Sequence, residues 1–392
     1  MDQSERRVLL FTIDAGGGHR SAARALVAAA EETRSHLAFR AESFQQILVQ
    51  LDVLKRLTGA SLEDAYNLIL RRHWNVLMVP LLRLMHAGIR LRRPALVRTL
   101  AEWFRAQPPP VAVVSVMPNF NGVMRDAIRA TWPGVPLIVV LTDLADFPPR
   151  FWIEPGLDHV VVGTDEAREQ ALALGLPPER VTRVSGMILN PSFYRRGGRQ
   201  AGGAVRAEMG LGKEDFTVTL LFGGKGSPEM LPLARELLET DPSWTVIAIC
   251  GDNPGLVERL APLEARHPGR LRRLGFTDRV AELMAASHVL VTKPGPGSLA
   301  EAFHQQVPVV VIRNRQTIPQ ERFNTDYVAR HGLGRVVRDW REIPEAVMAL
   351  RRDPAERRHL RERLAGLPPN RAVYEVLETI DAVIRVTGTS AG

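Results

Sequence analysis

Residues 289–302 read Val289-Leu290-Val291-Thr292-Lys293-Pro294-Gly295-Pro296-Gly297-Ser298-Leu299-Ala300-Glu301-Ala302. An apolar, β-branched run passes through a turn of two Gly and two Pro into the start of a helix. Gly295 and Gly297 let a ligand approach the backbone because they carry no side chain. Ser298 stands at an N-cap or first-turn position, where free N–H groups face an anion. The stretch therefore predicts a strand–turn–helix unit that holds a diphosphate.

Glu301 follows Ser298 by three residues. It lies too far into the predicted helix for a phosphate contact, and its carboxylate is well placed for the hydroxyls of a ribose. The same pair also fits an ordinary capping box, in which Ser298 and Glu301 only close the end of the helix. Both interpretations stay open on this stretch alone.

The alternation of apolar strands and helical segments runs along most of the chain and favours parallel sheets covered on both faces. A Gly/Arg-rich patch at 195–203 interrupts it and is the best candidate for a linker. We predict an α/β chain of two Rossmann-like domains facing across a cleft, 1–195 and 204–369, with a C-terminal helix (370–392) that packs back on the first. The predicted strands are 7–13, 37–41, 111–116, 137–141, 159–162, 216–222, 245–249, 271–274, 289–292 and 309–312.

The composition is that of a soluble globular protein, with 392 residues of which 45% are hydrophobic and 24% charged. The single cysteine, Cys250, excludes an intramolecular disulfide framework and fits a reducing compartment. The N-terminus shows no signal-peptide core, and no apolar run approaches the roughly 20 residues of a spanning helix. We therefore expect a cytoplasmic protein.

Positive charge is concentrated in a helical insert between residues 47 and 105. It carries ten Lys or Arg against four acidic residues, and no acidic residue lies between Arg71 and Arg98. Arg, Trp and Leu together are typical of a helix that lies on an anionic membrane. The alternatives are a core-packed insert with a solvated basic face and, more weakly, a nucleic-acid surface, although no nucleic-acid-binding module is recognisable. We expect peripheral binding to the inner face of the cell membrane, no nucleic acid, and contacts from Arg71, Arg72, Trp74, Arg83, Arg90, Arg92 and Arg93.

A Gly-rich loop also follows the first strand, with Gly16, Gly17 and Gly18 before His19. The dinucleotide fingerprint G-x-G-x-x-G fails here because Ser21 takes the place of its third Gly, which leaves only a weak case for NAD. Imidazole suits a general base near neutral pH, although a single His more often caps a helix or fills a core. Asp143, at the carboxyl end of the strand 137–141, either orients His19 or acts as the base itself.

The second half offers further ligand-binding residues. Gly223 and Gly224 permit close backbone approach, and the cation of Lys225 can stabilise a departing diphosphate; the alternative is a tight turn with a solvent-facing Lys. Backbone groups near Phe276 and Thr277 can meet the edge of a base. Gln320, Glu321 and Asn324 have the hydrogen-bonding groups for sugar hydroxyls, although such residues also simply begin helices. No zinc-binding motif is present, so we expect no metal.

Taken together, these stretches resemble one family: the monogalactosyldiacylglycerol synthases and bacterial processive diacylglycerol glucosyltransferases, relatives of the glycosyltransferase that makes lipid II. The resemblance spans nearly the whole chain. It is carried by Gly16-Gly17-Gly18-His19-Arg20-Ser21-Ala22, Thr142-Asp143, Gly223-Gly224-Lys225-Gly226, Lys293–Ala302 and Gln320-Glu321-Arg322-Phe323-Asn324, in this order.

The resemblance implies a GT-B fold and inverting transfer of a hexose from UDP-glucose or UDP-galactose to a membrane lipid hydroxyl, diacylglycerol above all, without a required cofactor or metal. It makes His19 the catalytic residue on the acceptor side. On the donor side, Gly297 and Ser298 would contact the diphosphate and Glu301 the ribose. Phe276 and Thr277 would lie near the uracil, and Gln320 and Glu321 would hold the hexose.

The chain departs from the family at two places that bear on the sugar and the acceptor. Pro319 stands where the family usually has Gly before the Gln-Glu pair, and 117–121 falls in a variable region. Two other functions remain open. UDP-sugar epimerases share the architecture but need no membrane, and a non-catalytic membrane-bound nucleotide-sugar sensor would bind UDP without turnover.

Overall fold

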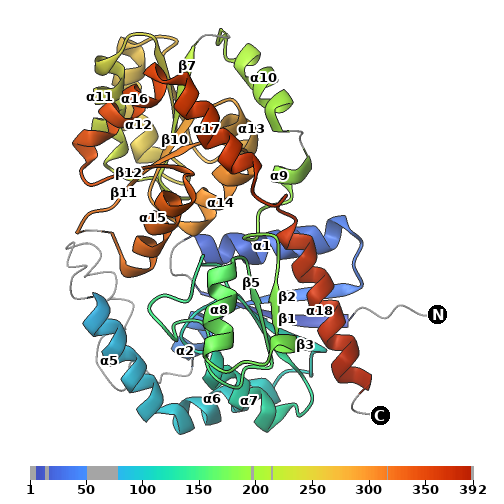
Figure 1. Cartoon of the computed structure of the whole chain (residues 1–392). Helices are drawn as coiled ribbons and strands as arrows, with labels where there is room; N and C mark the ends of the chain where they lie inside the picture. Colours follow the sequence, from blue (N-terminus) through green and yellow to red (C-terminus); the bar gives the residue numbers. More distant parts are fainter. Residues whose placement is uncertain are drawn as a thin grey trace. The chain divides into compact units, whose positions relative to one another are not determined.

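The computed structural model describes residues 6–13, 17–50, 78–195, 198–212, 215–315 and 317–389. The chain divides into two units (Figure 1). Unit 1 comprises Met1–Asn190, Ile318–Gln320 and Asn370–Gly392, and unit 2 comprises Pro191–Thr317 and Glu321–Pro369. Each contains a six-stranded parallel sheet with helices. The predicted α/β class with two Rossmann-like sheets is confirmed.

The sheet of unit 1 has the strand order β2-β1-β3-β4-β5-β6. Its central strands β3, β4 and β5 are buried along their whole length, as continuous apolar runs in a covered parallel sheet should be. Because all strands run parallel, their carboxyl ends share one edge, where the loops after β1, β3 and β4 gather. The strands are β1 Arg6–Thr12, β2 Leu37–Ser43, β3 Ala112–Ser115, β4 Leu137–Val140, β5 His159–Val162 and β6 Val181–Arg183.

The C-terminal helix α18 belongs to unit 1, where it packs against α1 (Figure 1). Nε2 of His36, in the loop between α1 and β2, lies 2.7 Å from Oδ1 of Asp381 on α18. The helices of unit 1 are α1 Gly18–Glu32, α2 Phe44–Gln50, α5 Met78–Leu91, α6 Arg93–Arg105, α7 Asn121–Thr131, α8 Asp165–Ala173 and α18 Ala372–Thr389, with the 3-10 turn η2 Pro178–Arg180.

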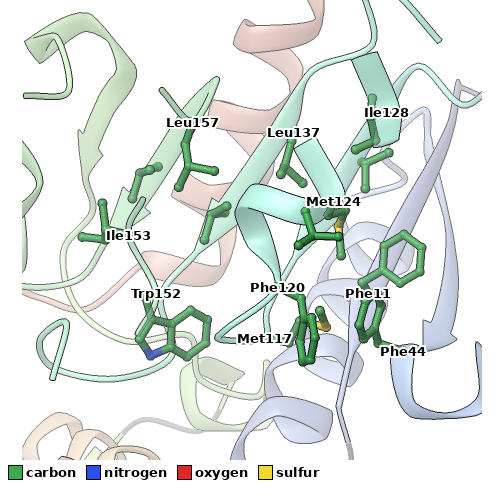
Figure 2. Packing of buried hydrophobic residues seen from close by; sticks show 14 of the residues in the cluster. Phe11, Phe44, Met117, Phe120, Met124, Ile128, Leu137, Trp152, Ile153 and Leu157 are labelled. Carbon is green, nitrogen blue, oxygen red and sulfur yellow. The ribbon is translucent and has the colours of Figure 1, made fainter. Parts of the chain in front are cut away.

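An aromatic core fills unit 1 on one side of its sheet. Phe11 of β1 meets Phe44 and Phe104 edge-on, with ring centroids 6.0 Å apart in each pair. Burying a side chain of this size contributes about 1.5–3 kcal/mol. Trp152, in the long loop after β4, belongs to the same cluster and is fully buried (Figure 2). The core therefore reaches the carboxyl edge of the sheet, where the acceptor-side residues were predicted.

Unit 2 repeats the plan with the strand order β12-β11-β10-β7-β8-β9. Its strands are β7 Phe216–Leu221, β8 Trp244–Ile249, β9 Leu271–Leu274, β10 Val289–Thr292, β11 Val309–Ile312 and β12 Gly334–Val337. Its helices are α9 Ser192–Arg195, α10 Gly198–Glu208, α11 Met230–Thr240, α12 Pro254–Arg266, α13 Val280–Ala285, α14 Pro296–His304, α15 Pro319–His331, α16 Ile343–Arg352 and α17 Pro354–Ala365, with the 3-10 turn η3 Trp340–Glu342. Cys250, after β8, is buried.

The prediction that residues 195–203 form a linker is wrong for the described part of this stretch, because Gly198–Glu208 forms helix α10. This helix packs closely on α13. A Cβ at Gly202 would lie 2.3 Å from the carbonyl oxygen of Ala285, so the glycine permits this contact. The division between the units falls earlier, between Asn190 and Pro191.

Candidate functional site

His19 occupies the first turn of α1, directly after the Gly-rich loop. Gly17 is the N-cap of this helix, and a Cβ at Gly17 or Gly18 would meet no atom within 4 Å among the described residues. Contacts with the described residues therefore do not require glycine at these two positions. Gly16 lies outside the described residues.

Three residues that follow β3 and β4 lie around the His19 ring. Oγ1 of Thr142 lies 3.0 Å from Nδ1, and the Trp152 ring lies 5.5 Å away between centroids. Burial lowers the pKa of His19 to about 4, and a hydrogen bond with the backbone of Val116 opposes this shift. The imidazole is therefore neutral near pH 7, which is the protonation state that a general base needs.

The sequence predicted that Asp143 either orients His19 or acts as the base itself, and the side chain that contacts Nδ1 of the imidazole is that of Thr142. The Asp143 carboxylate accepts a hydrogen bond of 2.7 Å from Nε1–H of Trp152. Burial raises the pKa of Asp143 to about 6, helped by the charge of Asp146 and opposed by this hydrogen bond. A solvated Asp would be the weaker base of the two candidates. Desolvation reverses that order, because it makes Asp143 more basic than His19.

Asp146 was not predicted, and it fixes the loop that carries Trp152. Its two carboxylate oxygens accept hydrogen bonds from the backbone N–H groups of Trp152 at 2.7 Å and Arg150 at 2.9 Å. The side chain of Asp146 is buried, and burial raises its pKa to about 6 against these hydrogen bonds. Asp146 stands four residues after Thr142, a spacing that alone does not separate a loop anchor from a ligand contact.

In unit 2, the first Gly-rich turn joins β7 to α11. Gly226 (φ 60°) and Gly251 (φ 62°) adopt left-handed backbone conformations. A Cβ at Gly226 would lie 2.7 Å from the Cys250 carbonyl oxygen, and one at Gly251 would lie 2.2 Å from that of Gly224. These two glycines therefore allow two neighbouring turns to pack together.

Three residues of the same turn remain open to solvent. A Cβ at Gly223 or Gly224 would meet no described atom within 4 Å, and Lys225 is exposed. The Lys225 backbone carbonyl accepts a hydrogen bond from the Asn253 amide at 3.0 Å, which fixes the turn below the side chain. This arrangement presents a glycine backbone and a cation together at the carboxyl edge of the sheet.

The second Gly-rich turn leads from β10 into α14. Gly295 is the N-cap and Pro296 the first helical residue, so Ser298 lies in the first turn and is not the cap. No side chain caps this end of the helix, and a Cβ at Gly297 would meet no described atom within 4 Å. The first-turn N–H groups of a helix carry a partial positive charge, so this end is suited to an anion.

Glu301 lies one turn further along α14. Burial raises the pKa of its carboxyl to about 8. Such a shift arises when a carboxyl is shielded from water without donors to stabilise its charge. The capping box with Ser298 does not form, and the carboxyl remains available for the hydroxyl donors of a ligand.

The residues predicted for the sugar fall into different environments on α15. Oε1 of Glu321 lies 3.9 Å from the position of a Cβ on Gly295, so this carboxylate borders the α14 turn. Asn324 is buried and donates a hydrogen bond of 2.8 Å to the Pro294 carbonyl, which makes it a support of the turn. The side-chain oxygen of Gln320 is buried without a hydrogen-bond partner in the described structure.

The two residues expected near a base lie on the loop after β9. The Phe276 side chain is 78% exposed, which is unusual for a large apolar residue and leaves its ring free to stack. Oγ1 of Thr277 accepts a hydrogen bond of 3.1 Å from the backbone N–H of Arg279, ahead of α13. The Thr277 side chain therefore shapes this loop.

The basic insert is described only in part. Arg71, Arg72 and Trp74 lie outside the described residues, as does the side chain of Arg83. On α5, Leu84 is 70% and Leu91 is 83% exposed, on one face of the helix at a seven-residue spacing, and Arg90 of this helix and Arg92 directly after it are also exposed.

Arg93 differs from its neighbours. Its guanidinium lies 2.7 Å from the carboxylate of Asp126 and 3.5 Å from that of Glu154, and it donates to the Gly122 carbonyl at 3.1 Å. The positive charge of Arg93 is therefore paired with carboxylates of unit 1.

The described residues contain no arrangement typical of a metal site: no group of three or more of their His, Cys, Asp or Glu side chains is placed to hold a metal ion. None of the described helices is both long and apolar enough to span a bilayer.

Comparison with known families decides the nature of unit 2. Residues 222–360 match the glycosyltransferase family 28 C-terminal domain. The chain carries a glycosyltransferase family 28 domain. All the predicted donor-side residues, from Gly223 to Asn324, lie within the matched range.

Curated relatives cover both units. The chain is 25% identical over 407 residues to the chloroplastic monogalactosyldiacylglycerol synthase of Spinacia oleracea, spanning 98% of this chain and 73% of the relative. It is 26% identical over 272 residues to the processive diacylglycerol beta-glucosyltransferase of Bacillus subtilis (strain 168), spanning 69% of this chain and 68% of the relative. The family resemblance and the enzyme class, glycosyltransferase, are confirmed.

Solved structures share the fold of this glycosyltransferase. MurG of Acinetobacter baumannii is 14% identical with a TM-score of 0.58, and the match covers 96% of this chain and 99% of that one. The UDP-GlcNAc 2-epimerase of Neisseria meningitidis, solved with UDP-GlcNAc bound, is 12% identical with a TM-score of 0.58, covering 95% and 99%. The fold is therefore GT-B, and the fold by itself does not distinguish transfer from epimerisation.

Proposed function

We propose that this glycosyltransferase moves a hexose from UDP-glucose or UDP-galactose to the hydroxyl of a membrane lipid, with diacylglycerol as the acceptor and inversion at the anomeric carbon. The observation that carries the proposal is the pairing of an uncapped helix end with a shielded carboxyl on α14. The first turn at Gly297 and Ser298 suits a diphosphate, and Glu301 suits the hydroxyls of a ribose. The names of both relatives include diacylglycerol, which supports the acceptor class.

The rest of the donor site follows from the environments of the other predicted donor residues. The exposed Phe276 ring is suited to stack on uracil. Glu321, beside Gly295, and the unpaired oxygen of Gln320 are acceptors for hexose hydroxyls. Lys225 supplies positive charge to the departing UDP, so that the reaction needs no metal.

On the acceptor side, His19 is the proposed general base. The lipid hydroxyl oxygen attacks the anomeric carbon, the bond from that carbon to the UDP oxygen breaks, and the hydroxyl proton passes to the imidazole. The role requires the tautomer in which Nδ1–H donates to Thr142 and Nε2 carries no proton. Asp143 carries negative charge above its pKa of about 6 and stabilises the imidazolium as it forms.

The lipid acceptor brings the protein to a membrane surface. On α5, the exposed Leu84 and Leu91 are suited to insertion between lipids, and the exposed Arg90 on the same helix and Arg92 directly after it are suited to anionic head groups. We expect this helix to lie on the inner face of the cell membrane, without spanning it.

The direct test incubates the protein with radiolabelled UDP-glucose or UDP-galactose and vesicles of diacylglycerol with anionic phospholipid. A labelled glycolipid is the expected product with one of the two donors. Free UDP-N-acetylglucosamine is the parallel substrate, and its isomerisation would identify an epimerase instead. Tight UDP binding without turnover on any acceptor would identify a nucleotide-sugar sensor, and either result would overturn the proposal.

A further inference from the structure

A buried polar network lies behind the acceptor-side residues, centred on Asn121 at the start of α7. The residue is 0% exposed. Its amide nitrogen donates to the carbonyls of Met117 at 3.1 Å and Trp152 at 3.0 Å, and its amide oxygen accepts from the Ser115 hydroxyl at 2.7 Å. The side chain thus joins the end of β3 to the loop after β4.

The residue that Asn121 holds is the one that contacts both candidate bases. Trp152 donates its indole N–H to Asp143, and its ring lies against the ring of His19. Its own backbone is fixed at two points, by Asp146 on the N–H group and by Asn121 on the carbonyl. A shift of the Trp152 backbone would therefore move the partner of Asp143 and the neighbour of His19 at the same time.

We infer that Asn121 is a positioning residue for glycosyl transfer, acting through Trp152 on His19 and Asp143. The inference rests on the proposed function, because it assigns those two residues to the acceptor side. Asn121 is buried and touches neither of them, and the role depends on its two amide donors. The Ser115 hydroxyl holds only the amide oxygen and also bonds within its own loop, so it is the less important contact.

Matched substitutions separate the donors from the acceptor. Asn121→Asp keeps the shape and the oxygen that Ser115 contacts but removes both amide donors. Asn121→Leu removes all three hydrogen bonds, whereas Ser115→Ala leaves both donors in place. Thr182→Val is the control, because it breaks another part-buried hydrogen bond of unit 1, that of Thr182 Oγ1 with His159 Nε2 at 2.8 Å, on β6. Asn121→Asp carries the test where Asn121→Leu does not fold.

Two measurements decide the role. The turnover number should fall about ten- to a hundredfold in both Asn121 variants, the cost of misplaced catalytic groups, with UDP affinity unchanged. Ser115→Ala and Thr182→Val should stay within about threefold of the parent chain. In ¹⁵N-tryptophan spectra, with the Trp152 indole signal assigned by Trp152→Phe, that signal should move in the Asn121 variants and not in the control.

The inference and the proposed function fail in different ways. Parent-like turnover or an unmoved Trp152 signal in both Asn121 variants would overturn the inference alone. The indole signal and UDP binding need no turnover. If the parent chain makes no glycolipid while the signal still moves, the link to catalysis is overturned along with the proposed function.

Discussion

Oγ1 of Thr142 lies 3.0 Å from Nδ1 of His19, which joins the end of β4 to the first turn of α1. The contact holds the imidazole at Nδ1, and a hydrogen bond with the Val116 backbone and the ring of Trp152 hold it further. In unit 1 it stands where a carboxylate stands in a Ser-His-Asp triad, but it brings no charge. In the proposed mechanism, the charge that stabilises a protonated His19 is that of Asp143, whose carboxylate accepts a hydrogen bond from Trp152, the neighbour of the imidazole.

His19→Ala should lower the turnover number roughly a hundredfold or more, the usual range for the loss of a general base. The affinity for UDP should change little, because the predicted donor residues other than Gln320 lie in unit 2. Turnover is measured with saturating vesicles and UDP affinity by calorimetry. Activity close to that of the parent chain, or a parallel loss of UDP binding, would make His19 a binding residue.

Asp143 should produce an acid limb in the pH dependence of kcat/KM. Its pKa of about 6 means that it ionises as the pH rises through 6, so the rate should increase there and level off above pH 7. In Asp143→Asn this limb should disappear, leaving a lower rate that is still measurable at pH 8. If Asp143→Asn is instead more damaged than His19→Ala, Asp143 is the base.

The α5 surface should bind anionic vesicles. Replacing the exposed pair Arg90 and Arg92 by Glu should abolish the dependence on anionic lipid, and replacing Leu84 and Leu91 by Ser should weaken binding at every composition. Flotation with vesicles of graded phosphatidylglycerol content measures both effects, and binding to the parent chain should weaken with salt.

A control distinguishes a specific role of the α5 surface from an effect of the net charge of the protein. Arg352→Glu with Arg358→Glu makes the same charge change on exposed residues of unit 2 and should leave flotation unaltered. Arg93 is left out because it makes ion pairs with Asp126 and Glu154. Equal loss in the unit 2 control would contradict a specific role for α5.

The buried strands could be predicted from sequence because their whole length is apolar. The predicted bounds of β5, β9, β10 and β11 match the structure. The two strands that were missed, β6 and β12, both lie at sheet edges. Val181-Thr182-Arg183 and Gly334-Arg335-Val336-Val337 have no continuous apolar run, and only their pairing with the neighbouring strand makes them strands.

The site shows the same division between local and long-range information. The Gly-rich turns and the place of His19 after one of them could be predicted from the sequence. A glycine turn before a helix depends only on residues that are adjacent in the chain. Asn324 was expected to contact sugar, but it supports the Pro294 carbonyl 30 residues away. The pKa values of His19 and Asp143 could not be predicted, because their desolvation is set by residues that are distant in the sequence.

Glu301→Gln should weaken UDP binding and should stabilise the folded chain at alkaline pH. The carboxylate is the proposed acceptor for ribose hydroxyls, and hydrogen bonds to a charged group contribute about 1.5–3 kcal/mol. The variant should therefore bind UDP about ten- to a hundredfold more weakly at pH 9, where the parent carboxyl is ionised.

The stability effect follows from the pKa of Glu301, which is about 8 in the folded chain against an ordinary value of 4.5. Between these values the folded chain binds more protons than the unfolded chain, so this group makes the free energy of unfolding fall as the pH rises through the window. Above pH 8 that stability is lost, and Glu301→Gln, which does not titrate, should keep it. Melting temperatures from pH 5 to 9 should converge at the acid end and favour the variant at the alkaline end. Glu345→Gln, on an exposed residue of the same unit, should show no such crossover. A variant as pH-dependent as the parent chain, with unchanged UDP affinity, would remove Glu301 from the donor site.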